Sequence, residues 1–186
     1  MFRFGGEKQR LGLNVAGLDR VLSVDPEART AEVQGMTTFE SLVDATLAYG
    51  LMPLVVPQLK TITLGGAVAG LGIESSSFRN GLPHESVREL EVLTGDGRVV
   101  VARPDNEHAD LFHAFPNSYG TLGYSLRLRI DLEPVQPYVR VRHLRFDSAE
   151  ECLATMATIC AERRHEGEPV DFVDGTGEPA KFSLGL

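Results

Sequence analysis

The sequence predicts a globular chain in which antiparallel hairpins are combined with short amphipathic helices. Its 186 residues are enough for one domain, or for one domain and part of another. Hydrophobic residues make up 42% of the chain and charged residues 24%, as is typical of globular proteins. Apolar residues recur at every second position in some segments and at every third or fourth in others, which indicates both strands and helices.

Composition also excludes several classes of partner. The formal net charge is −8, and no run of five basic residues occurs, so we expect no nucleic-acid partner. No stretch reaches the roughly 18 apolar residues that a membrane span needs, and the N-terminus lacks an apolar signal segment. We therefore expect no membrane span in this chain and a cytoplasmic location.

The two cysteines predict neither a disulfide nor a metal site. Cys152 and Cys160 lie eight residues apart in a segment with a helical pattern. On one helix they would be about 12 Å apart, which is too far for a disulfide. The histidines neither cluster with the cysteines nor have zinc-ligand spacing, so no metal is expected.

The first part of the chain predicts one hairpin and one helix. Met1 to Gly17 has no periodic pattern and is expected to be irregular. Strands Leu18–Val24 and Thr30–Gln34 are joined by a turn at Asp25, Pro26 and Glu27. Thr37 and Glu40 have capping-box spacing and predict the start of a helix that Gly50 ends.

The middle of the chain predicts an edge strand, a second hairpin and a long strand. Leu51–Val56 is apolar but broken by Pro53, which indicates an edge or irregular strand. Val87–Thr94 and Arg98–Ala102 flank a Gly-Asp-Gly turn. One or two helical turns are expected at Ala109–Phe115. A strand then follows at 124–132, with its leucines and Ile130 on one face and with Arg127 and Arg129 on an ion-paired or solvated face.

Two prolines within Glu133–Pro137 predict a domain boundary, which divides the chain into residues 1–134 and 135–186. The second part predicts a strand at Tyr138–Phe146 and a helix that Ser148 and Glu151 cap, running to about Arg164 and ended by Gly167. It also predicts strands at 171–173 and 181–186, with a turn at 174–175.

The densest feature is a glycine-rich segment with Gly65, Gly66, Gly70 and Gly72 within eight residues. Missing side chains would let backbone amides approach a bulky anionic or planar ligand, with a helix beginning near Gly65. Close packing of a turn against a sheet explains the glycines equally well. The pattern is not the dinucleotide fingerprint, because Ser75 stands where the third glycine belongs, and no P-loop lysine occurs.

Two segments resemble a known family. PQLKTITLGGAVAGLGIESSSFRNGL (57–82) and DLFHAFPNSYGTLGY (110–124) are similar to the FAD-binding domain of the vanillyl-alcohol-oxidase type, also called PCMH-type. Within it they look most like the 24-dehydrocholesterol reductase branch and its bacterial relatives. The resemblance implies an α+β fold, the second half of a PCMH-type FAD-binding domain, followed by the start of an α/β cap domain.

The resemblance also implies a cofactor site. Gly65 and Gly66 would lie closest to the pyrophosphate of FAD, and Gly120, Thr121 and Gly123 would form a second contact. The residues expected along FAD are Thr63, Leu64, Gly65, Gly66, Ala67, Val68, Ala69, Gly70, Leu71, Gly72, Ile73, Glu74 and Ser75. No Cys or His lies between Val55 and Arg79, so we expect non-covalent FAD.

The chemistry that the resemblance implies is hydride transfer through FAD, with reduction of a carbon–carbon double bond in a small hydrophobic, sterol-like substrate. NADPH is the candidate reductant of the flavin. No catalytic residue is assigned. Of the titratable groups near the glycine segment, Glu74 is expected to anchor the loop by hydrogen bonds and His84 to be a solvated turn residue.

Two other functions stay open at this point. One is an FAD-dependent alcohol or lactone oxidase that uses dioxygen, and the other is a non-catalytic remnant that does not hold FAD. Compared with the family, the chain lacks the first FAD-binding half and most of the cap. We expect it to be a fragment of a longer protein, which could associate peripherally with a membrane.

Overall fold

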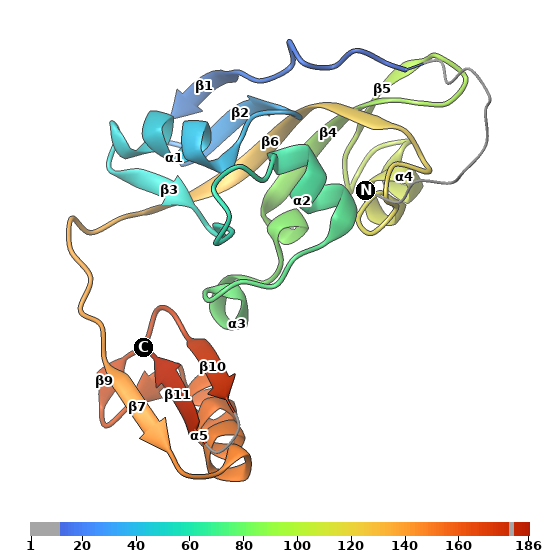
Figure 1. Ribbon diagram of the computed structural model, residues 1–186. Helices are drawn as coiled ribbons and strands as arrows, with labels where there is room; N and C mark the ends of the chain where they lie inside the picture. Colours follow the sequence, from blue (N-terminus) through green and yellow to red (C-terminus); the bar gives the residue numbers. More distant parts are fainter. Residues whose placement is uncertain (1–11, 179–180) are drawn as a thin grey trace.

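The computed structural model describes residues 12–178 and 181–186 (Figure 1). In this part of the chain, an antiparallel six-stranded sheet with helices comes first, and a three-stranded sheet with one long helix follows. The protein therefore has a mixed α/β fold built on antiparallel sheets. No helix in the described ranges is long and apolar enough to cross a membrane.

The first sheet is built around its longest strand, β6. Its strands are β1 (Val21–Asp25), β2 (Thr30–Gln34), β3 (Leu51–Pro53), β4 (Val87–Leu93), β5 (Val99–Ala102) and β6 (Tyr124–Pro134). The strand order is β1-β2-β6-β4-β5, and β3 pairs with the C-terminal end of β6. Every pair is antiparallel.

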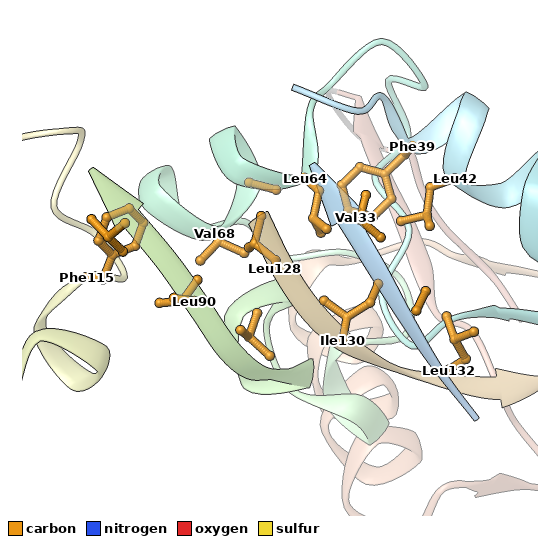
Figure 2. Packing of buried hydrophobic residues seen from close by; sticks show 14 of the residues in the cluster. Val33, Phe39, Leu42, Leu64, Val68, Leu90, Phe115, Leu128, Ile130 and Leu132 are labelled. Carbon is orange, nitrogen blue, oxygen red and sulfur yellow. The ribbon is translucent and has the colours of Figure 1, made fainter. Parts of the chain in front are cut away.

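Helices cover one face of this sheet. They are α1 (Phe39–Leu47), α2 (Leu64–Gly70), the 3-10 helix η1 (Pro83–Ser86) and α4 (Ala109–Ala114). The short helix α3 (Ser77–Asn80) lies away from this face, toward the C-terminal sheet and its helix (Figure 1). Figure 2 shows Phe39 and Leu42 of α1 and Leu64 and Val68 of α2 beside Leu128 of β6 and its neighbours, all of them buried. This core fixes α2 against the sheet.

The second unit carries its own small core. Its elements are β7 (His143–Phe146), α5 (Ala149–Glu162), β8 (Arg164–His165), β9 (Glu168–Pro169), β10 (Asp174–Glu178) and β11 (Lys181–Gly185). The sheet order is β10-β11-β7, and α5 packs on it through Cys152 and Ile159. Both cysteines of α5 are free thiols, as their spacing predicts.

Most of the predicted elements are present. In the first hairpin, the Asp25 carboxylate accepts hydrogen bonds from the amides of Glu27 and Ala28, which forms the expected turn. The second hairpin and the short helix α4 are also confirmed. Ser148 caps α5 as predicted.

Several boundaries in the first unit differ from the prediction. The N-cap of α1 is Thr38, because the carbonyl of buried Thr37 accepts the amide of Leu64 and is held in the contact between α1 and α2. In β6, Leu126 leaves the buried face, because the register slips there and Ser125 takes the inward position. Residues 12–17 have no regular element, and residues 1–11 lie outside the described part.

In the second unit, the strand predicted at 138–146 begins only at His143. Helix α5 ends where Arg163 adopts a left-handed conformation (φ 53°), not at Gly167. The turn predicted at Asp174 and Gly175 is wrong: both lie in β10, because Gly175 pairs with Leu184 in the register that β11 imposes.

Candidate functional site

The glycine-rich segment forms α2 and the chain that leaves it. Thr63 is the N-cap, and its hydroxyl accepts the amide of Gly66 at 3.2 Å. A helix starting next to Gly65 is therefore confirmed. At seven residues it is short, and it owes its position to the core described above.

At its N-terminal end, α2 uses its backbone amides within the protein. Leu64 donates to the Thr37 carbonyl at 2.9 Å, Gly65 donates to the Gly35 carbonyl at 2.8 Å, and Ala67 donates to the Thr63 carbonyl at 2.9 Å. A Cβ on Gly65 would lie 2.7 Å from the Gly35 carbonyl oxygen and would also collide with the Ser125 hydroxyl. Close packing therefore explains Gly65.

At its C-terminal end, the same segment is open. A Cβ on Gly70 would meet no atom within 4 Å, and one on Gly72 would reach only Pro83 at 3.9 Å. Leu71, between them, has φ 57° and ψ 157°, a conformation normally reserved for glycine. Within the described ranges, no group accepts a hydrogen bond from the amides of Gly72 and Ile73.

The second predicted segment lies beside this open end. The amide of Tyr119 donates to the carbonyl of Ala69 at 3.0 Å, which brings the loop after α4 against the end of α2. A Cβ on Gly120 would also point into open space, whereas one on Gly123 would lie 2.5 Å from the Leu93 carbonyl oxygen. The two predicted segments therefore meet, but Gly123 serves packing.

Apolar and polar groups are left exposed or unpaired around this junction. The side chain of Ile73 is 81% exposed and that of Tyr119 is 70% exposed. The Ser118 hydroxyl is buried and has no hydrogen-bond partner among the described residues. Open glycines, unpaired amides and uncovered apolar side chains together form a surface suited to a flat molecule with polar edges.

Hydrogen bonds to Gln58 and Leu54 hold the segment that follows α2 and the helix α3 after it. The Glu74 carboxylate accepts the amide of Gln58 at 3.2 Å, which is the anchoring role predicted for it. Ser76 and Asn80 both donate to the Leu54 carbonyl, at 3.0 and 2.7 Å. These bonds fix the direction in which the segment from Leu71 to Ser75 leaves α2.

His84 is not the solvated turn residue that we expected. It lies in η1, and its Nδ1 is buried without a hydrogen-bond partner in the described part of the chain. It lines a cavity of about 130 Å³ together with Val68, Phe112 and His113. His84 is therefore half-buried, because η1 places it beside this cavity.

A cleft of about 890 Å³ lies between Ile73–Ser75 and the second unit. Its apolar lining includes Ile73, Phe78, Leu82, Val141, Met156 and Phe172. His143 and Cys160 also line it, and burial raises the pKa of the Cys160 thiol. Sequence reasoning missed His143 and Cys160 as part of a site, because they lie 70 and 87 residues from Ile73 and carry no local signal.

The exposed backbone at this junction is suited to a bulky ligand with polar edges. Residues 3–103, more than half of the chain, match the family of the FAD binding domain. The chain belongs to this family.

Curated relatives agree with the family assignment. A Delta(24)-sterol reductase of Homo sapiens is 32% identical over 157 residues, which cover 83% of this chain and 29% of that protein. The Arabidopsis thaliana protein of the same name is 32% identical over 157 residues, which cover 83% of this chain and 28% of that protein. Cytokinin dehydrogenase 2 of Oryza sativa subsp. japonica is 29% identical over 171 residues, which cover 89% of this chain and 30% of that protein. The chain spans less than a third of the length of these relatives.

The junction fits FAD on its own chemistry. FAD combines phosphate and carbonyl oxygens, which need hydrogen-bond donors, with a wide planar ring, which needs apolar cover. The amides of Gly72 and Ile73 offer donors, Gly70 and Gly120 leave room for close approach, and Ile73 and Tyr119 offer apolar surface. The start of α2 does not offer donors, since its amides are already bonded.

Proposed function

We propose that this chain is the FAD-holding part of an oxidoreductase that reduces a carbon–carbon double bond of a hydrophobic, sterol-like substrate. The observation that carries the proposal is the open backbone from Gly70 to Ile73, next to the loop at Gly120, in a chain of the FAD binding domain family. The names of the Delta(24)-sterol reductases support the reaction class. We also propose that residues 1–134 belong to the FAD domain and that residues 135–186 begin the cap.

The chain's own residues would hold the cofactor without a covalent bond. The amides of Gly72 and Ile73 would donate to its oxygens, and Ile73 and Tyr119 would exclude water from its ring. When bound, FAD supplies the hydride chemistry that such a reaction needs. Residues 63–69 and Gly123 would position this surface rather than touch the cofactor, since Gly65 and Gly123 are packed against their own chain.

Two features of the cleft support the rest of the proposal. Its apolar lining favours a hydrophobic substrate over a charged one. Burial raises the pKa of the Cys160 thiol, which lowers the fraction of reactive thiolate at this position. NADPH is the proposed electron donor, and no general acid is proposed.

The first experiment tests cofactor binding. The purified chain should quench the fluorescence of added FAD, and acid precipitation should release all of the flavin. Gly70→Leu fills the open space and should weaken FAD binding by about tenfold or more, a loss of about 1.4 kcal/mol. Gly95→Leu is the matched control, because a Cβ there also meets nothing but lies in the β4–β5 turn. A folded wild-type chain that never quenches FAD would refute the proposal and favour the non-catalytic alternative.

A second candidate function is oxidation of the substrate, which the match to a cytokinin dehydrogenase favours. The FAD-loaded protein separates the two under anaerobic conditions. Bleaching of the flavin by NADPH supports the reductase. No bleaching by NADPH, but peroxide release with an alcohol or lactone in air, supports an oxidase.

A further inference from the structure

The short helix α3 links the two units of the protein. Figure 1 shows it between the six-stranded sheet and the second unit. It directly follows the segment from Leu71 to Ser75, so whatever holds α3 also holds that segment. Each side of α3 is bonded to a different unit.

On the first side, Arg79 forms a bidentate ion pair with Glu133 at the end of β6. Its Nη1 donates to Glu133 Oε2 at 2.7 Å and its Nη2 donates to Glu133 Oε1 at 2.9 Å. The two side chains are only 22% and 18% exposed, and Asn80 donates to the same carboxylate at 3.0 Å. A two-pronged ion pair of this kind fixes direction as well as distance.

On the other side, α3 and its flank hold the second unit. The amide of Val173 donates to the Ser75 carbonyl at 2.8 Å, and Phe78 packs against the core of α5 and β11. Asp171 Oδ1 lies 3.8 Å from Arg79 Nε. That Nε is buried and has no hydrogen-bond partner among the described residues, although Asp171 faces it.

We propose that Arg79 is a positioning residue that couples the segment from Leu71 to Ser75 to the second unit, with Glu133 as its fixed anchor and Asp171 as its partner in the second unit. For the cofactor, this inference rests on the function proposed above. The coupling has a structural basis: Leu71–Ser75 runs between α2, packed on the sheet at Gly65, and α3, held by Arg79.

The unpaired Nε of Arg79 favours movement of the second unit toward α3. A small approach of the second unit would bring Asp171 within hydrogen-bond distance of Nε and would satisfy the last donor of the guanidinium. Arg79 would then bond to both units at once. Lysine cannot replace it, because an ammonium group lacks the planar fork.

Amide hydrogen exchange measured by NMR on the chain without cofactor tests the coupling. The Val173 amide is the reporter, because its acceptor, Ser75, lies across the cleft. Arg79→Gln should speed its exchange by about tenfold or more, the scale expected for loss of a charge-assisted hydrogen bond. Arg88→Gln is the matched control: Arg88 pairs with Asp131 on β6, has no ion pair with α3 or the second unit among the described residues, and should leave Val173 unchanged.

Two further variants distinguish coupling between the units from a general loss of structure in α3. Asp171→Asn should speed exchange at Val173 by a smaller factor than Arg79→Gln does, while the amides of Asn80 in α3 and of Gly81, its C-cap, stay protected. Arg79→Lys should behave more like Arg79→Gln than like wild type. Unchanged exchange at Val173 in Arg79→Gln overturns the inference, and if that variant unfolds, unchanged exchange in Asp171→Asn does so.

Addition of FAD separates this inference from the proposed function. In the wild type, FAD should slow exchange at Gly72, Ile73 and also Val173. In Arg79→Gln, the slowing should remain at Gly72 and Ile73 but no longer reach Val173; slowing that still reaches Val173 counts against the coupling. If FAD slows exchange at none of these amides in the wild type, the proposed function fails. The comparison of wild type with Arg79→Gln in the absence of FAD still decides the coupling.

Discussion

The two ends of α2 use the same residue type for different purposes. Gly65 lies where three parts of the chain meet, and a side chain there would strike Gly35 and Ser125. Gly70, five residues later, has open space around the position of a Cβ. The difference teaches that a run of glycines in one segment need not have one cause.

The packed end depends on the irregular register of β6. The slip near Leu126 turns Ser125 inward, and the Leu126 carbonyl accepts the amide of Gly35 at 3.0 Å. Gly35 in turn accepts the amide of Gly65, so the sheet, the chain before α1 and α2 are joined at one point. At the open end, the amide of Tyr119 bonds to Ala69, but no atom in the described part of the chain lies within 4 Å of a Cβ on Gly70, and Leu71 is held in a strained conformation.

The largest expected effect is that of Gly65→Ala. The new methyl group would lie 2.7 Å from a backbone oxygen that the Gly65 amide already binds, so α2 must shift away from the sheet. We expect the free energy of unfolding to fall by about 3 kcal/mol, as for overpacked cores. Urea denaturation followed by circular dichroism measures it. A variant as stable as wild type would show that α2 moves freely and would remove the contrast between the two ends.

A smaller effect is expected from Thr63→Ala at the same end. The variant loses the hydroxyl that caps α2, and the unfolding free energy should fall by about 1 kcal/mol. Thr61→Ala is the control, because Thr61 is exposed and makes no hydrogen bond within the described part of the chain. Equal losses for both variants would contradict the capping role.

Features set by neighbouring residues were predicted from the sequence. The Asp25 turn, the Ser148 cap and the strands of both hairpins depend on residues a few positions apart, and each is present. Features set by distant residues were missed. Thr37 loses its predicted capping role to a contact with Leu64, and the register of β10 follows from β11.

The candidate site divides in the same way. The glycine pattern and the family resemblance selected the segments 63–75 and 120–123, and the bond from Tyr119 to Ala69 brings them together. Which glycines pack and which stay open depends on Gly35 and Ser125, which lie 30 and 60 residues from Gly65. The bond between Arg79 and Glu133 spans 54 residues and has no local signal. Contact of FAD with the selected residues stays a prediction.

The smallest expected effect has the opposite sign and completes the comparison. Gly70→Ala adds a methyl group in open space at the end of α2 and lowers the entropy of the unfolded chain, so the unfolding free energy should rise by about 0.5 kcal/mol. The same urea titration measures it beside Gly65→Ala. Because the methyl group also intrudes on the surface proposed for FAD, this more stable variant should bind FAD more weakly than wild type. A stabilised variant with unchanged FAD affinity would mean that the cofactor does not approach Gly70, and a destabilised one would mean that this end of α2 is packed as well.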